Sequence, residues 1–417
     1  MNLTLRQAGV TAAAALLAAG VAAQGSPYVI GGSVAYSHQS NTLGLADGAS
    51  LAAGSDYTSQ SDNVTSLALI GGLDQPIGRQ RVFGDLTLRS NRYARNELLN
   101  HQSYSVTGGV DWQTIERISG NLTLKSNRDL VRFSSTERPT GGRNLVTTRQ
   151  ADASARIGVV TRYTFEAGGN WRSVDYSDRE YDGRDFRQQT AFIGARYWPS
   201  GTNYLGLTLR NGSGRYPGFR TAANTAAGDG FDRRDVDLSL SLQTSGSSTL
   251  FARTSYSRIN HELPGRADYA GFTGLFRGTF NATAKLQFAA EVARDRGQEI
   301  DILLFDPAVG VARVESARLA TVARLRAAFA ASTKTEVHAN ASATRRTLAQ
   351  TSLFTNVQES GRERSTQFGL GASWTPTRTS RIGCDVSRDQ RRSDIASARL
   401  NISANSTTCF AQLTLQP

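Results

Sequence analysis

The sequence predicts an all-β fold: a transmembrane, antiparallel, up-and-down β-barrel of about 18 strands, with short periplasmic turns and long extracellular loops. Three observations support this. Apolar and polar residues alternate along most segments, short turns alternate with long polar segments, and a nearly identical nonapeptide recurs at residues 84–92 and 120–128. Because successive side chains of a strand point to opposite faces, each such segment has one apolar and one polar face. The pattern therefore indicates half-buried strands rather than helices.

The composition fits a barrel better than a soluble protein. Only 39% of the 417 residues are hydrophobic, whereas Gly, Ser, Thr and Arg are abundant. In a membrane barrel only every second residue of a strand must face lipid, so a polar chain can still span the bilayer. The formal charge is +12. The arginines are spread over every predicted hairpin rather than gathered in one basic patch, so we expect no nucleic-acid partner.

Residues 1–23 have the organisation of a secretory signal peptide. Arg6 supplies a positive start, an apolar run follows, and Ala23 ends a small-residue motif of the kind that signal peptidase cleaves. The apolar run is shorter than the roughly 20 residues that a spanning helix needs. No change in composition divides the rest of the chain. We therefore expect export, one barrel domain over residues 24–417, and a location in the bacterial outer membrane.

Polar breaks of two lengths separate the predicted strands. The short ones lie at residues 74–78, 114–117, 160–163, 199–202, 244–248, 281–283, 331–333 and 375–378. Longer ones alternate with them, at residues 41–61, 129–150, 175–187, 211–233, 295–315 and 348–364. Short turns at one end and long loops at the other are typical of outer-membrane barrels, and these short turns with two free termini give about 18 strands.

One predicted strand has a helical alternative. Residues 312–331 are rich in Ala, Leu and Arg, which favour helices, and a helix here could plug the lumen. We predict a strand instead, because Ala317, Leu325 and Phe329 share one parity.

Aromatic residues mark one edge of the predicted membrane region. Trp112, Tyr197, Trp198 and Trp374 stand at strand ends beside short turns. Tryptophan and tyrosine are enriched where a barrel meets the membrane interface. We therefore expect these side chains to form part of an aromatic girdle.

The two cysteines are candidates for a disulfide. The midpoint between Cys384 and Cys409 falls near Ser397, in the polar stretch that joins the last two predicted strands. This symmetry would place the two thiols opposite each other on one hairpin, and exported proteins experience oxidising conditions. Two separate thiols, or a metal site without a nearby His, are the weaker alternatives.

The chain resembles a known family in its architecture and its ending. The signal peptide, the Arg-rich alternating strands and the terminal TCFAQLTLQ at residues 408–416 are similar to the EpsL-type outer-membrane β-barrels of exopolysaccharide gene clusters. The resemblance implies a porin-like channel through which exopolysaccharide reaches the cell surface. Polysaccharide would be the transported substrate, outer-membrane lipid would surround the barrel, and periplasmic or inner-membrane export proteins are candidate partners.

Charged residues of inward parity are the candidate binding residues. A closed sheet of 16 to 18 strands leaves an aqueous channel, and facing acids and bases would set its transverse field. The candidates are Asp85, Arg89, Asp111, Lys125, Arg156, Arg196, Arg210, Arg253, Lys285 and Arg324, with Asp152, Glu166, Arg172, Asp237, Arg277 and Glu291 on the same face. Excess Arg favours anionic solutes, which keeps a general diffusion porin for small solutes as the alternative function.

A hydrolase is the third candidate function. Glu336, His338, Asn340 and Ser342 share one face of a predicted strand and resemble the His/Asn/Ser set of outer-membrane phospholipases. A nucleophile must lie within hydrogen-bond reach of its base. His338 and Ser342 are four residues apart, roughly 13 Å along a strand. We therefore expect a polar lumen ladder at this place, and no enzyme.

The densest acidic segment, residues 175–185, partly matches a calcium-binding loop. Counted from Asp178, Gly183 stands at position six, but Glu180 and Gln189 stand where the loop needs Asp or Asn and Glu. We expect a solvated extracellular loop whose aromatic side chains could contact sugar rings. No metal or cofactor is expected.

Overall fold

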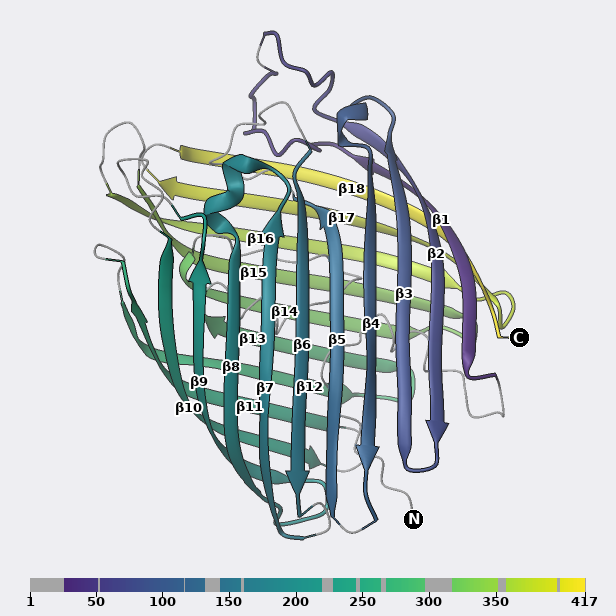
Figure 1. The fold of residues 1–417 in the computed structure, drawn as a ribbon. Helices are drawn as coiled ribbons and strands as arrows, with labels where there is room; N and C mark the ends of the chain where they lie inside the picture. The colour runs from purple at the N-terminus through teal and green to yellow at the C-terminus, as the bar shows by residue number, and fades with distance from the viewer. Residues whose placement is uncertain are drawn as a thin grey trace.

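The eighteen strands of the computed structural model form one closed antiparallel sheet (Figure 1). The structure describes residues 26–51, 53–115, 117–131, 143–158, 161–219, 228–244, 248–263, 268–296, 317–351, 358–395 and 398–416. The predicted signal peptide at residues 1–23 lies outside these ranges. Among the described residues, no helix is long and apolar enough to cross a membrane.

Strands that are neighbours in the sequence are neighbours in the barrel. The wall consists of β1 (Tyr28–Gln39), β2 (Asp62–Ile77), β3 (Gln80–Tyr93), β4 (His101–Gln113), β5 (Ile118–Leu130), β6 (Leu145–Ile157), β7 (Tyr163–Tyr176), β8 (Phe186–Tyr197), β9 (Tyr204–Tyr216), β10 (Asp229–Thr244), β11 (Ser248–His261), β12 (Tyr269–Asn281), β13 (Leu286–Asp295), β14 (Ala317–Ala330), β15 (Thr335–Thr351), β16 (Gln358–Trp374), β17 (Ser380–Ile395) and β18 (Ala398–Leu415). Short 3-10 helices, η1 (Glu97–Leu99) and η2 (Arg179–Arg184), lie in two loops. β1 pairs with both β2 and β18, which closes the sheet. The predicted fold class is confirmed.

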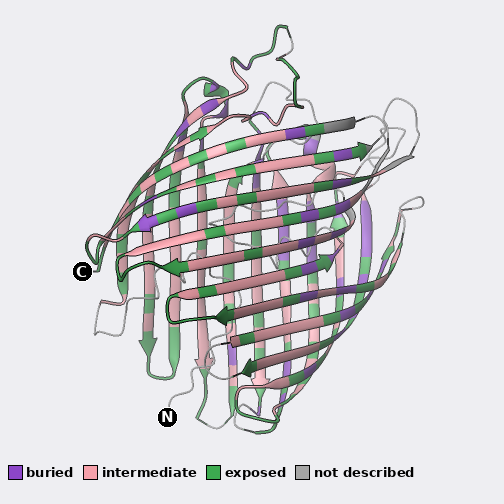
Figure 2. Cartoon of the chain, turned by 180° about the vertical axis from the view of Figure 1, so that it is seen from behind, coloured by how far each residue is buried: buried purple, intermediate pink, exposed green. Residues whose placement is uncertain are grey.

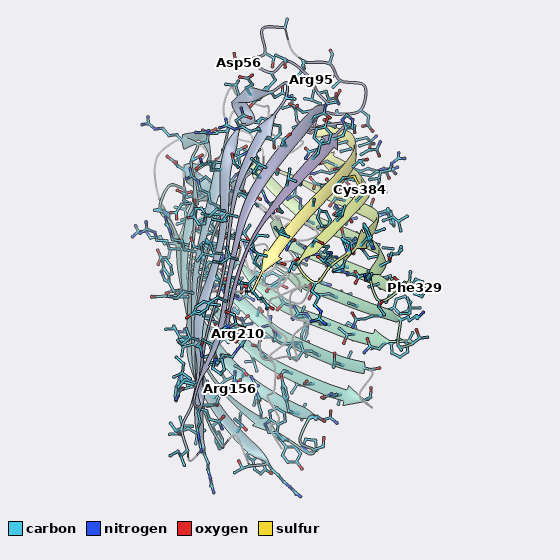
Figure 3. The ribbon with its side chains drawn as sticks, turned by 90° about the vertical axis from the view of Figure 1, so that its right-hand side faces the viewer. Asp56, Arg95, Arg156, Arg210, Phe329 and Cys384 are labelled. Carbon is cyan, nitrogen blue, oxygen red and sulfur yellow. A yellow bond between two sulfur atoms is a disulfide. The ribbon has the colours of Figure 1, made fainter. Side chains whose placement is uncertain are left out.

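The alternation in the sequence becomes the two faces of the wall. On β10, Val236 and Leu238 are each 49% exposed. Asp235 and Asp237, which alternate with them along the strand, are each only 3% exposed. Figure 2 shows the same alternation of exposed and less exposed residues along most strands. Phe329 lies on the outer side of the wall in Figure 3. Apolar side chains therefore face outward, where lipid replaces water, and polar side chains face the lumen.

The segment with helical propensity is a strand. β14 pairs along its length with β13 and β15, and outward-facing Leu325 and Phe329 are 50% and 45% exposed. A helix would leave the edges of β13 and β15 unpaired, and unpaired backbone groups are costly next to lipid. Pairing within the barrel thus overrides local propensity.

The turn between β2 and β3 is the tightest in the described chain. Ile77 pairs with Gln80, which leaves only Gly78 and Arg79 to reverse the direction. Gly78 has φ of +63°. Two-residue hairpin turns of this kind need positive φ, which glycine adopts without steric cost.

Several strands continue further toward the extracellular end than the sequence predicted. Residues 211–233 and 348–364 were predicted as loops, yet β9 runs to Tyr216, β10 starts at Asp229, and β15 and β16 leave only residues 352–357 between them. The outward residues in these extensions are polar, for example Arg215 and Arg364. The alternation of apolar and polar residues ends where the lipid ends, but hydrogen bonding between the strands does not.

The aromatic residues beside the short turns do not all face lipid. Tyr197 and Trp374 are exposed on the outer face, at 38% and 50%. Trp198 instead turns toward the lumen, where its indole Nε1 donates to Thr164 Oγ1 at 3.1 Å. Its ring centroid lies 4.8 Å from that of Tyr204. The prediction that Trp198 belongs to the outer girdle is wrong, because Ile193 and Tyr197 face outward on β8 and the next residue, Trp198, keeps the alternation and faces inward.

Cys384 and Cys409 are joined by a disulfide, with their Cα atoms 4.0 Å apart. The two residues are directly opposite in the register of β17 and β18. They share the parity of Ile382 and Leu413, which are exposed on the outer surface. The disulfide therefore lies on the outer face of the barrel and contributes nothing to the lumen.

Candidate functional site

The inner face of the barrel carries acids and bases in nearly equal numbers. Strand register and burial place the following bases inward on the described strands: Arg81, Arg89, Lys125, Arg156, Arg172, Arg196, Arg210, Arg233, Arg253, Arg277, Arg324, Arg326, Arg346, Arg381 and Arg391. The inward acids are Asp62, Asp74, Asp85, Asp111, Asp129, Asp152, Glu166, Asp229, Asp235, Asp237, Glu291, Asp295, Glu336, Glu363, Asp385 and Asp389. The excess of Arg on which we based a preference for anionic solutes thus does not lie in the described lumen wall.

Two arginines share one carboxylate on β6–β8. Glu166 Oε2 lies 2.6 Å from Arg196 Nη2 and 3.4 Å from Arg156 Nε. The Glu166 side chain is only 6% exposed. The Arg196 guanidinium also stacks over the Tyr204 ring, at 4.8 Å from its centroid. A buried charge is tolerable only when it is paired. Glu166, Arg156 and Arg196 together carry one net positive charge.

A second network joins three strands, β9, β10 and β13, on another part of the wall. Arg210 makes a bidentate contact with Asp237, at 2.6 Å from Nε to Oδ2 and 3.1 Å from Nη2 to Oδ1. Arg233 contacts Asp235 at 2.8 Å and Asp295 at 3.1 Å. Arg233 on β10 can reach Asp295 on β13 because the inward residues between them are small. Their side chains are almost wholly buried, so this network is part of the wall rather than mobile surface charge.

Two further ion clusters complete the charged wall. Glu363 Oε1 lies 2.8 Å from Arg346 Nε and 2.7 Å from Arg391 Nε, and its side chain is 3% exposed. Arg277 Nε lies 2.6 Å from Glu291 Oε2, and these two side chains remain 27% and 16% exposed. Charges of both signs therefore face each other within the wall, and the more exposed pair is accessible to a solute.

The face that resembled a hydrolase site holds a histidine between carboxylates. His338 Nε2 lies 2.6 Å from Asp385 Oδ1, and His338 Nδ1 lies 3.9 Å from Glu336 Oε1. The His338 and Asp385 side chains meet over Gly371, which separates them in the register, and a Cβ at Gly371 would collide with both. Neither ring nitrogen is hydrogen-bonded to Ser342. The geometry provides a positioned base without the adjacent nucleophile that hydrolysis requires.

The part of the wall around β18 and β1 has no charged inward residue through the middle of its described strands. On β18, the inward residues Ser406, Thr408 and Gln412 carry hydroxyl or amide groups, and β1 continues this surface with Ser33 and Ser37. β2 places charges only near its ends. The described lumen is therefore charged along most of β3–β17 and neutral, but still polar, around β18 and β1.

The acidic segment that resembled a calcium loop packs at the extracellular mouth. Its residues 179–184 form η2, and Tyr181 is buried with the inward-facing Phe186, Tyr216 and Phe231. Gly183 approaches the backbone of Gly218 in the next extracellular loop. The prediction of a solvated loop with free aromatic side chains is wrong here. The alternation of apolar residues continues into the ends of β8–β10, and Tyr181 covers that apolar surface.

Asp185 anchors this loop to β7. Its Oδ1 accepts the backbone N–H of Tyr176 at 2.8 Å. Burial raises the pKa of Asp185 to about 6, and the neighbouring Asp175 and Asp182 add to the rise, while the Tyr176 hydrogen bond and Arg187 oppose it. The loop therefore carries a carboxyl group that titrates near the pH of the cell surroundings.

The structure brings some predicted candidates into contact and leaves others apart. Asp111 pairs with Arg81 at 3.4 Å, and Arg324 stands opposite Glu291 in the register. Asp152 accepts hydrogen bonds from Asn170 and Gln150 at 2.6 and 2.8 Å. Asp85 and Arg89 both lie on β3, Lys125 lies on β5 in the register row of Asp85, and Arg253 lies apart from them on β11. Their role in binding stays a prediction.

Lys285 is the candidate that the structure places elsewhere. It lies in the short turn before β13, exposed at the periplasmic end, and its carbonyl accepts the Ala330 N–H at 2.8 Å. Lys285 thus lies in a turn and not on a strand, and its contribution to the lumen stays a prediction. Conversely, Arg233 and Glu363 were missed because they fall in predicted loops, and Asp235 was missed just beyond one of them. Extending the strand parity would have found all three.

Comparisons with known proteins return likenesses of shape only. No family model and no curated protein matches the chain. Among solved structures, OccK2 (OpdF) of Pseudomonas aeruginosa shares 12% identity at a TM-score of 0.49, over 94% of this chain and 100% of that one. OccAB3 of Acinetobacter baumannii shares 10% at a TM-score of 0.46, over 93% and 99%. The outer membrane protein OpdK of P. aeruginosa shares 12% at 0.44, over 93% and 98%.

The closed sheet and its apolar outer belt decide the class of protein. The chain is an outer-membrane β-barrel. Its strands alternate lipid-facing and lumen-facing residues in the manner of porins. Among the described residues of this barrel, no three His, Cys, Asp or Glu side chains are grouped to hold a metal ion. The chemistry that the described lumen offers is therefore that of fixed charges, hydroxyls and amides.

Proposed function

We propose that the barrel is a porin-like channel for the passive diffusion of small polar solutes across the outer membrane. A ring of 18 strands spaced ~4.8 Å apart and tilted by ~40° is roughly 35 Å across between backbones. Barrels of this strand number leave an aqueous channel after the side chains are placed. The size supports a solute pathway rather than a filled barrel.

The observation that carries this proposal is the paired charge of the inner wall. Arg277–Glu291 and Arg210–Asp237 both place opposite charges at 2.6 Å on the wall. Such pairs orient water and hydrogen-bond to hydroxyl groups, but they attract neither sign of ion strongly, because their fields largely cancel at a distance. Neutral and zwitterionic solutes fit this wall better than multiply charged anions.

Solute entry into proteoliposomes tests the proposal. The full mature chain, refolded into lipid vesicles, should admit small neutral sugars and zwitterionic amino acids at similar rates, and anionic sugar acids no faster. Vesicle swelling measures the entry, with protein-free vesicles as the control. Swelling no faster than that control would contradict a channel, and a marked preference for the anionic sugar acids would contradict the solute class.

We also propose exopolysaccharide passage as a second candidate function. It is supported by the resemblance of the sequence to EpsL-type barrels and by the uncharged wall around β18 and β1, where Ser406, Thr408 and Ser33 present hydroxyl groups. Such a surface could exchange hydrogen bonds with a sliding sugar chain without holding it. Deletion of the gene should then reduce polysaccharide at the cell surface while the neighbouring export machinery is intact. Unchanged surface polysaccharide would exclude this role.

A further inference from the structure

The net positive charge of the described strands lies on the outer face of the barrel. Beyond the apolar belt, at the extracellular ends of the strands, outward positions are repeatedly arginine: Arg92, Arg128, Arg149, Arg187, Arg215, Arg234, Arg258, Arg294, Arg345, Arg362, Arg364, Arg388 and Arg392. The outward acids on the same described strand ends are only Asp175, Asp232 and Asp394. We call these arginines the outer arginine girdle.

The girdle begins where the lipid-facing residues end. On β10 the outward series is Leu240, Leu238 and Val236, and the next outward residue is Arg234. On β15 the outward alanines at residues 339–343 are followed by Arg345. The guanidinium groups thus stand at the height of the headgroups of the outer leaflet.

The strand register sets several of these arginines directly beside one another. Arg345, Arg364 and Arg392 form one row across β15, β16 and β17, and all three are exposed. Arg294 on β13 continues the row past Thr321 on β14. Directly opposed residues have Cβ atoms about 5 Å apart, and like charges in such positions repel.

The row has no counter-charge within the protein that the structure describes. None of Arg345, Arg364 and Arg392 forms an ion pair with a described acid. A second arc repeats the arrangement, with Arg187 opposite Arg215 and Arg234 opposite Arg258. Rows of like charge on a wall whose inner face pairs its charges indicate a ligand of opposite sign outside the barrel.

We propose that the outer arginine girdle binds the phosphate groups of a phosphorylated glycolipid in the outer leaflet. Arginine presents a planar fork of donors that matches phosphate oxygens in a bidentate manner, and Arg–phosphate contacts are charge-assisted. Neighbouring arginines about 5 Å apart can share one phosphate. The girdle contains no lysine.

The distribution around the barrel favours lipid over a protein partner. The girdle arginines stand on β3, β5, β6, β8–β11, β13 and β15–β17, so they are distributed around most of the circumference. Lipid surrounds a barrel on all sides, whereas a protein partner covers one patch. A second copy of the chain would bring arginine rows against arginine rows. This inference rests on the outer-membrane location and is independent of what passes through the lumen.

Lipid binding by the full mature chain in detergent tests the proposal. The probes are a bisphosphorylated lipid A, the same lipid after enzymatic removal of its phosphates, and phosphatidylglycerol. The triple variant R345Q/R364Q/R392Q should bind the phosphorylated lipid roughly a hundredfold more weakly than wild type, since each arginine near an anionic surface contributes about fivefold. The variant R345K/R364K/R392K should bind with intermediate affinity.

A matched control removes the same charge from the lumen. The variant R89Q/R253Q/R324Q loses three inward positive charges and should bind the phosphorylated lipid as wild type does. If the triple Gln variant fails to fold, judged by heat-dependent gel mobility, R234Q/R258Q on the other arc serves in its place, with about a 25-fold loss expected. Unchanged affinity of the girdle variants would overturn the proposal. Equal binding of the dephosphorylated lipid or of phosphatidylglycerol would also overturn it.

Discussion

Arginine occupies both faces of this barrel in opposite electrostatic settings. On the inner face, Glu363 lies 2.8 and 2.7 Å from two guanidinium groups, and its side chain is 3% exposed. On the outer face, Arg345 and Arg364 stand side by side in the register, and neither pairs with a described acid. Arginine on the inner face therefore stabilises the wall through ion pairs, whereas these arginines on the outer face are left free to bind a ligand.

The difference follows from the surroundings of each face. Inward charges are packed against neighbouring side chains, and an unpaired buried charge costs several kcal/mol. Arginines beyond the apolar belt face water and lipid headgroups, where an unpaired charge costs little and attracts anionic lipid. A net charge of +12 is thus poor evidence for the selectivity of the lumen.

The largest effect is expected when an inner carboxylate is removed. Glu363→Gln leaves Arg346 and Arg391 without their shared counter-charge, and breaking such a buried pair costs about 3–5 kcal/mol. The free energy of unfolding, measured by denaturant titration of the refolded barrel in detergent, should fall by that amount. The outward, exposed Asp232→Asn is the matched control and should change it by less than about 0.5 kcal/mol. If Glu363→Gln and Asp232→Asn lowered the free energy of unfolding equally, the proposed difference between the inner and outer faces would be contradicted.

The outer face carries a covalent cross-link, the Cys384–Cys409 disulfide. Cys409→Ser removes a disulfide that closes a separation of 25 residues. Loops of this length are stabilised by about 3 kcal/mol in the chain-entropy model. Because β17 and β18 are already paired in the barrel, we expect a loss of about 2 kcal/mol, the low end of typical values, with unchanged solute entry into vesicles. Reduction of the wild-type protein should reproduce the loss, and a change in solute entry would contradict the outward position.

Asp185 sharpens the comparison because it is a partly buried carboxyl group that no ion pair in the described structure compensates. Its folded-state pKa of about 6 lies above the ordinary value of 3.8, so the folded loop binds a proton more readily than the unfolded loop. Docking of residues 177–185 is therefore strengthened as the pH falls through about 6 toward 4, and weakened above it. Since the group is partly exposed, the gain is only about 1 kcal/mol.

Hydrogen exchange of the Tyr176 amide, corrected for the intrinsic rate, measures this docking. Protection should be greater at pH 5 than at pH 7.5 in the wild type. In Asp185→Asn it should be high at both pH values, because the amide oxygen still accepts the Tyr176 N–H. A wild-type protection that does not change with pH would refute the assignment.

The smallest effect concerns the accessible lumen pair. Removing one charge at ~7 Å from a passing ion changes its energy by about 0.6 kcal/mol in water, or roughly threefold in relative permeability. Arg277→Gln should shift the channel toward cations, and Glu291→Gln should shift it toward anions by a similar factor. Reversal potentials in planar bilayers measure both. Shifts of the same sign in the two variants would show that the pair does not act on the permeating ion.

Local patterns in the sequence were sufficient to predict the barrel. The alternation and the spacing of short turns predicted the strands, including β14, where Leu325 and Phe329 kept one parity despite helix-favouring neighbours. The same patterns predicted that Cys384 and Cys409 would face each other across the last hairpin. These features depend on residues a few positions apart, and such features can be read from a single chain.

Contacts between distant strands could not be predicted in this way. Arg233 reaches Asp295 across two intervening strands, which depends on the register of all four and on the small inward side chains between them. The strand ends beyond the membrane were missed because the apolar signal stops there while the pairing continues. That omission concealed the outward parity of Arg215 and Arg364, and hence part of the girdle.

The reversal potential of the wild-type channel tests the central claim most directly. The claim is that the lumen charges are compensated and that the net positive charge lies outside. In a planar bilayer with a steep KCl gradient, the wild-type barrel should show a reversal potential close to zero. A large potential of the sign expected for anion selectivity would show that the excess arginine acts within the lumen, and would contradict this account.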